Sequence, residues 1–309
     1  MQNRKGFHLP TLLLLGSGIL FVSFSGILVK ISLSPPSRVA LYRILFATLF
    51  YGLFLPFFPR NTASQPPSKT PLVAKPILLG LLAGFFLALH FRFWIEAFSH
   101  TSVAGSVIPL AIQPVLVWVL SLLFLKEGFS GKMVLPLVLV SSGMLLLSAG
   151  DLVHNPSFAK GDLFSLAGTF FVSVFLVIGR KLVPRFGAYR FNFLAYATAS
   201  LWVLLFSQFD PGPLLLASPR EWIIALSLGG LCSFLGYLSI THALKTLPAP
   251  TVAVALVGEP VLSITWAWLL LGEVASLPQV LGFSVGLVGM LLFFRNLKKR
   301  RSPKAPPIM

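Results

Sequence analysis

Long apolar runs separated by short polar segments dominate this sequence. A helix needs about 20 apolar residues to cross the hydrocarbon core of a bilayer, and ten runs approach or exceed that length: 9–31, 39–58, 76–98, 103–125, 132–150, 162–179, 189–208, 222–244, 249–271 and 277–295. The longer connections, such as 59–75, are rich in proline and polar residues, as expected of loops. Transmembrane β-strands would instead alternate polar and apolar residues over segments of about ten. The pattern predicts an all-α polytopic membrane protein with ten transmembrane helices.

The first run follows two basic residues, Arg4 and Lys5, as the apolar part of a signal peptide would. It is too long for that part, and no small-residue cleavage site follows before Lys30. We therefore expect the first run to be a retained helix.

Composition supports a membrane protein. Of the 309 residues, 56% are hydrophobic and only 10% are charged, whereas soluble domains carry about 25% charged residues. This excludes an ordinary soluble enzyme and a disordered chain. Cys232 is the single cysteine, so a disulfide within the chain is excluded as well.

The net charge of +16 is distributed unevenly between the two sides of the predicted bundle. Of 24 lysines and arginines, 18 fall in the termini and loops on one side, four (Lys30, Arg38, Lys160 and Arg220) on the other, and Arg43 and Arg92 within runs. Basic residues concentrate on the cytoplasmic side of membrane proteins. Both termini are thus predicted to be cytoplasmic, in a membrane of the bacterial inner-membrane type.

The basic segment 298–301 is expected to lie on anionic lipid. Nucleic-acid binding by this tail is the weaker alternative. The bilayer is therefore an expected partner, and nucleic acid is not.

The two halves of the chain resemble each other at an offset of 146 residues. At this spacing Ala97 matches Ala243, Pro114 matches Pro260, and Glu127 matches Glu273. The first run of each half matches at an offset of 150, where Phe-Val-Ser recurs at 21–23 and 171–173. Five runs per half is an odd number, so the second repeat would enter the membrane from the opposite side, as in many transporters. We predict two inverted repeats, 9–150 and 160–296, followed by a basic cytoplasmic tail, 297–309.

Several motifs combine into a known pattern. In the second half they are Leu244-Lys245-Thr246-Leu247-Pro248, Glu259-Pro260-Val261, Leu269-Leu270-Leu271-Gly272-Glu273, Gln279, Gly282 and Gly286; in the first half they are Arg43, Leu89-His90-Phe91, Trp94, Thr101-Ser102-Val103-Ala104, Pro114 and Phe124-Leu125-Lys126-Glu127. In order, spacing and number of runs the chain resembles the EamA-type transporters of the drug/metabolite transporter superfamily, over residues 9–295. The resemblance implies ten helices in two EamA repeats, a cavity lined mainly by runs three, four, eight and nine, and transport, usually export, of small metabolites, amino acids or drugs.

Ionisable and polar side chains inside the runs are the candidates for binding, because they are costly in a bilayer. Glu259 lies near the centre of run nine, and its repeat counterpart Gln113 lies near the centre of run four. Glu259 would bind a cationic amine or titrate during the transport cycle; the alternative is a helix-packing role. Prolines interrupt helices, so Pro109, Pro114 and Pro260 are predicted hinges, and the carbonyls of Leu110 and Leu256 would lose their helical partners.

Aromatic candidates come from runs three and eight. His90 and Trp94 are four residues apart and share a helix face, which suits an aromatic or amphiphilic substrate. Tyr237, the repeat counterpart of Phe91, is a further candidate. The alternative for each is simple packing against a neighbouring helix.

The remaining charges within the runs have two interpretations each. Arg92 and Glu96 are four residues apart and form either a structural ion pair, which we favour, or a site for a zwitterion. The family usually has uncharged residues at these two positions. Arg43 would either extend its charge to the membrane surface or neutralise a buried carboxylate such as Glu259, in a structural or gating role. Glu127 and Glu273 would order loops.

We therefore expect a secondary transporter, not an enzyme, that exports small metabolites by alternating access around His90, Trp94, Gln113, Tyr237 and Glu259. The alternatives are efflux of drugs or cationic compounds, a membrane-embedded lipid-modifying enzyme and a structural or sensory membrane protein. Scattered histidines and the absence of a phosphate-binding motif predict no metal, no cofactor and no ATPase. Proton coupling is left open, and a monomer or weak homodimer is expected.

Overall fold

The computed structural model describes residues 9–57, 74–127, 131–154, 159–210, 213–272 and 277–301, and all regular elements in these ranges are helical. In the first half the helices are α1 (Leu9–Ser23), α2 (Ser25–Ile31), α3 (Pro36–Phe54), η1 (Leu55–Phe57), α4 (Ala74–Ala97), α5 (Val103–Val107), η3 (Ile108–Ile112), α6 (Gln113–Leu125), η4 (Gly131–Met133) and α7 (Val134–His154). In the second half they are α8 (Ala159–Phe186), α9 (Ala188–Ser207), α10 (Pro219–Ser227), η6 (Leu228–Gly236), α11 (Tyr237–Ala243), α12 (Ala249–Leu256), α13 (Gly258–Leu271) and α14 (Leu277–Arg301). Helices suit these apolar runs because each satisfies its own backbone hydrogen bonds without water.

Six helical stretches in the described part of the chain are long and apolar enough to cross a membrane. They are Leu9–Ile31, Pro36–Phe57, Lys75–Ala97, Lys160–Phe186, Pro219–Ala243 and Ala249–Leu271. Shorter apolar helices, such as Gln113–Leu125, lie beside them. The protein is therefore a multi-pass helical membrane protein, and the number of ten crossings stays a prediction.

The helices follow the predicted runs to within a few residues, except at the basic ends of two helices. Helix α14 continues beyond the run 277–295 to Arg301, into the segment predicted to be a tail. The run 162–179 corresponds to α8, which continues to Phe186 and includes Pro184 near its end. The additional turns carry Arg180, Lys181 and Arg185, whose polarity ended the apolar run although the helix itself continues. Gly187, with a φ of 79°, then separates α8 from α9.

Two of the apolar runs are interrupted near the predicted hinge prolines. The fourth run is divided into α5, η3 and α6, with Pro109 and Pro114 at the starts of η3 and α6. The ninth run is divided into α12 and α13 at Val257, just before Pro260. The prediction of a free Leu110 carbonyl is wrong, because the backbone tightens there and the Gln113 N–H donates to it.

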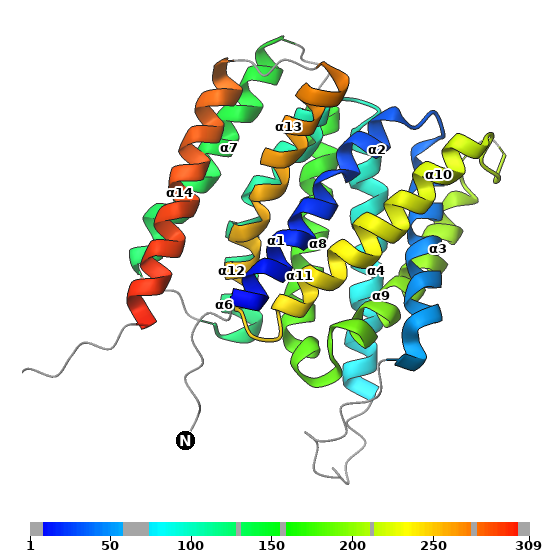
Figure 1. Ribbon diagram of the computed structural model, residues 1–309, viewed down its shortest axis with the longest axis horizontal. Helices are drawn as coiled ribbons and strands as arrows, with labels where there is room; N and C mark the ends of the chain where they lie inside the picture. Colours follow the sequence, from blue (N-terminus) through cyan, green and yellow to red (C-terminus); the bar gives the residue numbers. More distant parts are fainter. Residues whose placement is uncertain are drawn as a thin grey trace, which may run out of the picture.

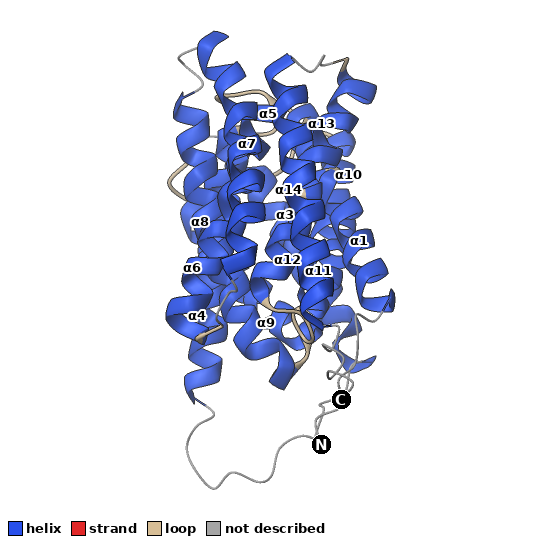
Figure 2. Ribbon diagram, turned by 90° about the vertical axis from the view of Figure 1, so that its left-hand side faces the viewer, coloured by secondary structure: helices blue, strands red, loops and turns tan. Residues whose placement is uncertain are grey.

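The two interrupted runs follow opposite directions along the bundle. In Figure 2, α5 lies at the upper end of the bundle and α6 lower, whereas in Figure 1 α12 lies low and α13 high. The described chain begins with α1 at the lower end and finishes with α14 at that same end (Figure 1). This arrangement fits the two inverted repeats expected from the sequence.

Glycine contacts repeat with the same symmetry. A Cβ on Gly18 of α1 would lie 2.9 Å from the carbonyl oxygen of Gly236, and a Cβ on its counterpart Gly168 of α8 would lie 3.1 Å from the backbone nitrogen of Trp94. Helix α1 thus packs closely on η6 and α11, as α8 packs on α4.

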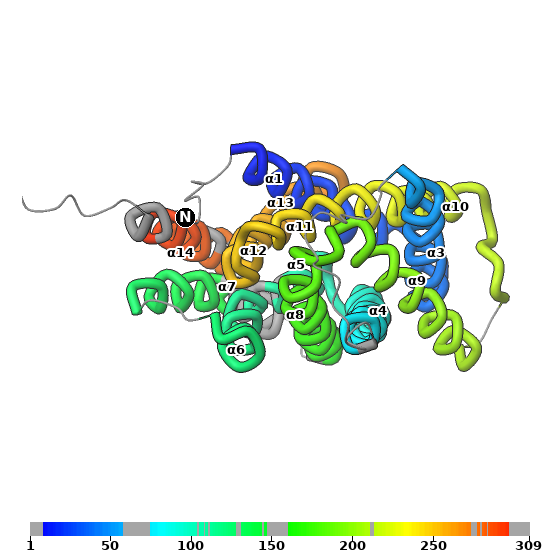
Figure 3. The backbone as a smooth tube through the Cα atoms, turned by 90° about the horizontal axis from the view of Figure 1, so that it is seen from below, coloured from blue at the N-terminus to red at the C-terminus, as the bar shows by residue number. Residues whose placement is uncertain are grey.

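Seen from below in Figure 3, α7 and α14 form a pair at one edge, away from α3 and α4.

Candidate functional site

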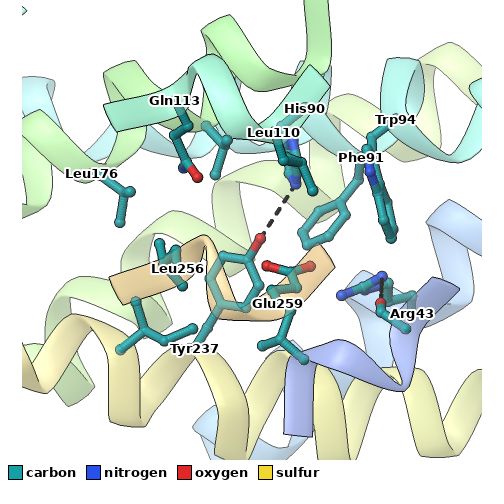
Figure 4. A pocket seen from close by; sticks show the side chains of 14 residues that line it. Arg43, His90, Phe91, Trp94, Leu110, Gln113, Leu176, Tyr237, Leu256 and Glu259 are labelled. Atoms are coloured by element: carbon teal, nitrogen blue, oxygen red, sulfur yellow. Dashed lines mark hydrogen bonds between the residues drawn. The ribbon is translucent and has the colours of Figure 1, made fainter. Parts of the chain in front are cut away.

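A pocket lies where the two repeats meet. Its lining comes from both halves of the chain: Val22, Ser25, Arg43, His90, Phe91, Trp94, Leu110, Gln113, Val172, Leu176, Tyr237, Ile240, Leu256 and Glu259. Figure 4 shows the polar side chains turned toward a common space between aromatic and aliphatic walls. A few convergent polar groups in a mostly apolar concavity are typical of small-molecule sites.

The pocket is built largely from residues that the internal repeat relates to each other. The related pairs in its lining are Val22 and Val172, Phe91 and Tyr237, Trp94 and Ile240, Leu110 and Leu256, and Gln113 and Glu259. The first pair has the 150-residue offset and the others have the 146-residue offset. The pocket therefore lies on the approximate symmetry axis between the repeats. If the two repeats exchanged conformations, the side of the membrane from which the pocket can be reached would change.

All five side chains predicted to bind substrate line this pocket: His90, Trp94, Gln113, Tyr237 and Glu259. Their role in binding stays a prediction. The three predicted hinge prolines lie at the helix interruptions and not among the lining residues.

Arg43 of α3 is the buried cation of the pocket. Its side chain is 1% exposed, so it does not extend to the membrane surface. Its Nε donates to the hydroxyl of Ser233 at 2.8 Å and its Nη1 to the hydroxyl of Ser25 at 2.5 Å. The guanidinium carbon lies 4.3 Å from the centroid of the Phe91 ring, a cation–π geometry. Serine hydroxyls and an aromatic face thus hold the guanidinium in place.

Glu259 supplies the anion. It lies in the first turn of α13, where the partial positive charge of a helix N-terminus stabilises a carboxylate. Within the described parts of the chain its carboxylate has no ion pair within 4.0 Å, with Arg43 or any other cation. Figure 4 shows it between Tyr237 and Arg43, facing the pocket. Cation and anion therefore share the pocket without a direct contact.

His90, Trp94 and Tyr237 are held by specific hydrogen bonds. The Nδ1 of His90 lies 2.9 Å from the carbonyl oxygen of Gly168, and its Nε2 lies 3.3 Å from the hydroxyl of Tyr237. The Trp94 indole donates to the carbonyl of Ser106 at 3.1 Å. All three rings are buried, so their positions relative to the pocket are fixed by these contacts together with packing.

Arg92 and Glu96 lie outside the pocket lining. Arg92 donates to Glu96 at 2.5 Å and to Asp210, which follows α9, at 3.0 Å. His100 lies 3.5 Å from the second oxygen of Glu96. The side chains of Arg92 and Glu96 are about one quarter exposed. This network connects α4 to the segment after α9.

Two further basic side chains, Arg180 of α8 and Lys30 of α2, bind chain segments near the ends of other helices. Glu127 accepts a hydrogen bond from Arg180 at 2.8 Å, and Arg180 also donates to the carbonyl of Leu244 at 2.8 Å. Lys30, the repeat counterpart of Arg180, donates to the carbonyl of Thr101 at 3.0 Å. Glu273, which was predicted to order a loop like Glu127, lies outside the described residues.

Sequence reasoning missed part of the pocket. Ser25 and Ser233 orient Arg43, yet an isolated serine in an apolar helix carries little signal. Val22 and Val172 could have been found, because the repeated Phe-Val-Ser motif marked the first run of each half. Runs one and six therefore line the pocket, as does run two through Arg43, in addition to the four runs that the family resemblance implied.

Comparison with known proteins agrees with this arrangement. The model of the EamA-like transporter family matches two segments, residues 9–149 and 159–295. The chain belongs to the EamA-like transporter family. It is thus a membrane transporter with two EamA segments, and its relatives are named as transporters, not as enzymes.

Relatives of this EamA-like transporter are distant but match over much of their length. The uncharacterized transporter YdfC of Bacillus subtilis is 25% identical over 291 residues, covering 91% of this chain and 89% of that protein. The pseudopaline exporter CntI of Pseudomonas aeruginosa is 28% identical over 230 residues, covering 72% of this chain and 76% of CntI. A solved crystal structure superimposes with a TM-score of 0.70, covering 95% of this chain and 99% of its own at 19% sequence identity. That structure supports the fold alone.

Proposed function

We propose that this protein is a secondary transporter that exports a small zwitterionic metabolite, with amino acids and related amphiphiles as the first candidates. The observation that carries the proposal is the construction of the pocket from repeat-related pairs, such as Gln113 and Glu259. Two related bundles around one shared site can exchange inward-open and outward-open shapes. The exporter named among the relatives supports the direction.

The charges of the pocket support a zwitterion. Arg43 offers N–H donors to a carboxylate, and Glu259 offers oxygens to an ammonium group. Because the two charges have no direct ion pair, a ligand that bridges them would pair with both. The walls of Leu110, Leu176 and Leu256 would cover an apolar side chain of that ligand.

The test is a thermal-shift screen of purified protein against the standard L-amino acids, with a matched series for charge. The series is L-leucine, 3-methylbutylamine and 4-methylpentanoate, which share one branched chain and differ in their charged groups. We expect stabilisation by L-leucine and little by the amine or the acid. Binding should be followed by transport of radiolabelled L-leucine in liposomes. Equal stabilisation by the three compounds of the series would overturn the zwitterion proposal. So would a screen in which none of the amino acids stabilises the protein.

A specific observation favours one second candidate, the efflux of organic cations. The Glu259 carboxylate shares its pocket with the rings of Phe91, Trp94 and Tyr237, and aromatic faces attract cations. Under this alternative, cells expressing the protein would expel a cationic dye, and Glu259→Gln would abolish that efflux. L-Leucine would then have no effect on the melting temperature.

We further propose ten crossings with both ends in the cytoplasm of a bacterial-type inner membrane. The distribution of basic residues supports this topology. So does the position of the start of α1 and the end of α14 at the same end of the bundle (Figure 1). Alkaline phosphatase fused after Arg220 should be active outside the cytoplasm, and a fusion after Lys245 should be inactive. The opposite result would reverse the orientation.

A further inference from the structure

The hydrogen bonds of His90 form a chain that passes through both repeats. It begins at the carbonyl of Gly168 in α8, crosses the His90 imidazole of α4 and ends at the hydroxyl of Tyr237 in α11. Figure 4 shows its second bond, between His90 and Tyr237. Gly168 permits this contact, because a Cβ there would lie only 3.3 Å from the His90 carbonyl oxygen and 3.0 Å from the Trp94 Cβ. The close approach of α8 to α4 thus brings a backbone acceptor to His90.

The direction of each hydrogen bond in this chain follows from the chemistry of its first acceptor. A carbonyl oxygen only accepts, so Nδ1 of His90 must carry the proton that is donated to Gly168. In the neutral imidazole the other nitrogen, Nε2, is then an acceptor. The Tyr237 hydroxyl must therefore donate its own proton to Nε2.

The neutral form of His90 is the one that fits its surroundings. The pocket already holds the guanidinium of Arg43, whose charge an ionised Glu259 would balance. An imidazolium would add an uncompensated charge to a site in which His90 is 3% exposed. No carboxylate forms an ion pair with His90 in the described ranges of the chain.

We propose that His90 is a positioning residue that makes the Tyr237 oxygen a pure hydrogen-bond acceptor for the substrate. With its proton committed to His90, the Tyr237 oxygen presents only lone pairs to the pocket. Glu259, also without a donor proton when ionised, faces the same space (Figure 4). Two acceptors side by side select an N–H donor group, such as a primary ammonium, over a quaternary one.

This inference rests on the proposed function only where it names the substrate group, so its first test needs no ligand. Protein labelled with ¹⁵N-histidine would be examined by NMR in nanodiscs, and the His90 signals assigned by their loss in His90→Gln. We expect a pyrrole-type Nδ1 and a pyridine-type Nε2. The reverse tautomer, or an imidazolium at neutral pH, would overturn the proposal even if transport is established.

The second test measures selectivity between L-leucine and N,N,N-trimethyl-L-leucine, which lacks N–H donors. Wild type should bind L-leucine more tightly, and Tyr237→Phe should reduce that preference about tenfold, because a hydrogen bond to a charged group is lost. Tyr196→Phe is the matched control, because Tyr196 is fully buried beside Tyr237 but does not line the pocket. An unchanged preference in Tyr237→Phe would overturn the selective role.

Variants of His90 separate positioning from packing. Gln at position 90 offers a carbonyl that can accept the Tyr237 proton, whereas Leu offers none. We expect His90→Gln to retain most of the preference and His90→Leu to lose it as Tyr237→Phe does, even with melting temperatures that remain close. If both variants showed the same preference for L-leucine over its trimethylated form, His90 would contribute only by packing. If no amino acid binds at all, the proposed function fails, and the NMR result alone decides the hydrogen-bond chain.

Discussion

The guanidinium of Arg43 lies over the ring of Phe91, with 4.3 Å between its central carbon and the ring centroid. The same guanidinium donates to Ser25 of α2 and to Ser233 of η6. One side chain thus connects α3 and α4 of the first half to the π-helical stretch of the second. Such wide helical turns are frequent at functional sites, because they redirect side chains and backbone groups. Arg43 is therefore part of the wall of the pocket and also part of the contact between the repeats.

Replacing Arg43 with Lys should lower the stability of the protein and its affinity for substrate, even though the positive charge is kept. An ammonium cannot reproduce the planar fork that reaches both serines, and losing one hydrogen bond to a charged group costs about 1.5–3 kcal/mol. The melting temperature and L-leucine binding should both fall. Arg92→Lys is the control, because Arg92 is partly exposed and outside the pocket. Equal effects of the two substitutions would contradict the special position of Arg43.

Glu259→Gln should separate proton coupling from substrate movement. The amide has nearly the same shape but cannot release a proton. In liposomes that contain the purified variant, transport driven by a pH gradient should be abolished, while exchange of labelled for unlabelled substrate continues. Glu96→Gln should leave both unchanged, because Glu96 lies outside the pocket. A pH dependence identical to wild type in Glu259→Gln would show that this carboxyl is not the coupling group.

Gly143→Ala should loosen the pairing of α7 with α14. A Cβ at Gly143 would clash with the backbone nitrogen of Gly286 and lie 2.5 Å from the carbonyl oxygen of Gly282, so the two helices would have to separate. Forcing one extra carbon into a close-packed interface typically costs about 1–3 kcal/mol. Thermal melts should show the loss, whereas Gly16→Ala, which has no atom within 4 Å of the added carbon, should melt like wild type.

Arg180 and Glu127 should show a small but measurable energetic coupling. Their side chains are 22% and 26% exposed, so solvent screening limits the pair to about 0.2–1 kcal/mol. A double-mutant cycle of Arg180→Gln and Glu127→Gln measures this coupling. Arg180→Gln should cost more than Glu127→Gln, because it also removes the donor to the Leu244 carbonyl. Strict additivity of the two substitutions would show that the contact has no energetic role.

Much of the fold could be predicted from the chain because hydropathy is a local property. The helices lie within a few residues of the ten apolar runs, except where the basic ends of α8 and α14 extend beyond their runs. The repeat offset was equally visible, and it matched Gln113 with Glu259 before their common pocket was known. Polar residues in the middle of apolar runs stand out without any knowledge of packing.

Only the tertiary structure decided which charges face the pocket. Arg43 lines it, whereas Arg92 binds both Glu96 and Asp210 outside it. A soluble helix reveals its buried face by its apolar stripe, but a membrane helix is apolar toward lipid and toward its neighbours alike. The rotation of α3 and α4 about their axes is therefore set by contacts such as that of Arg43 with Ser233, between residues 190 positions apart. The sequence alone determined the helices, the repeat and the polar candidates; helix packing decided which of those candidates share one site.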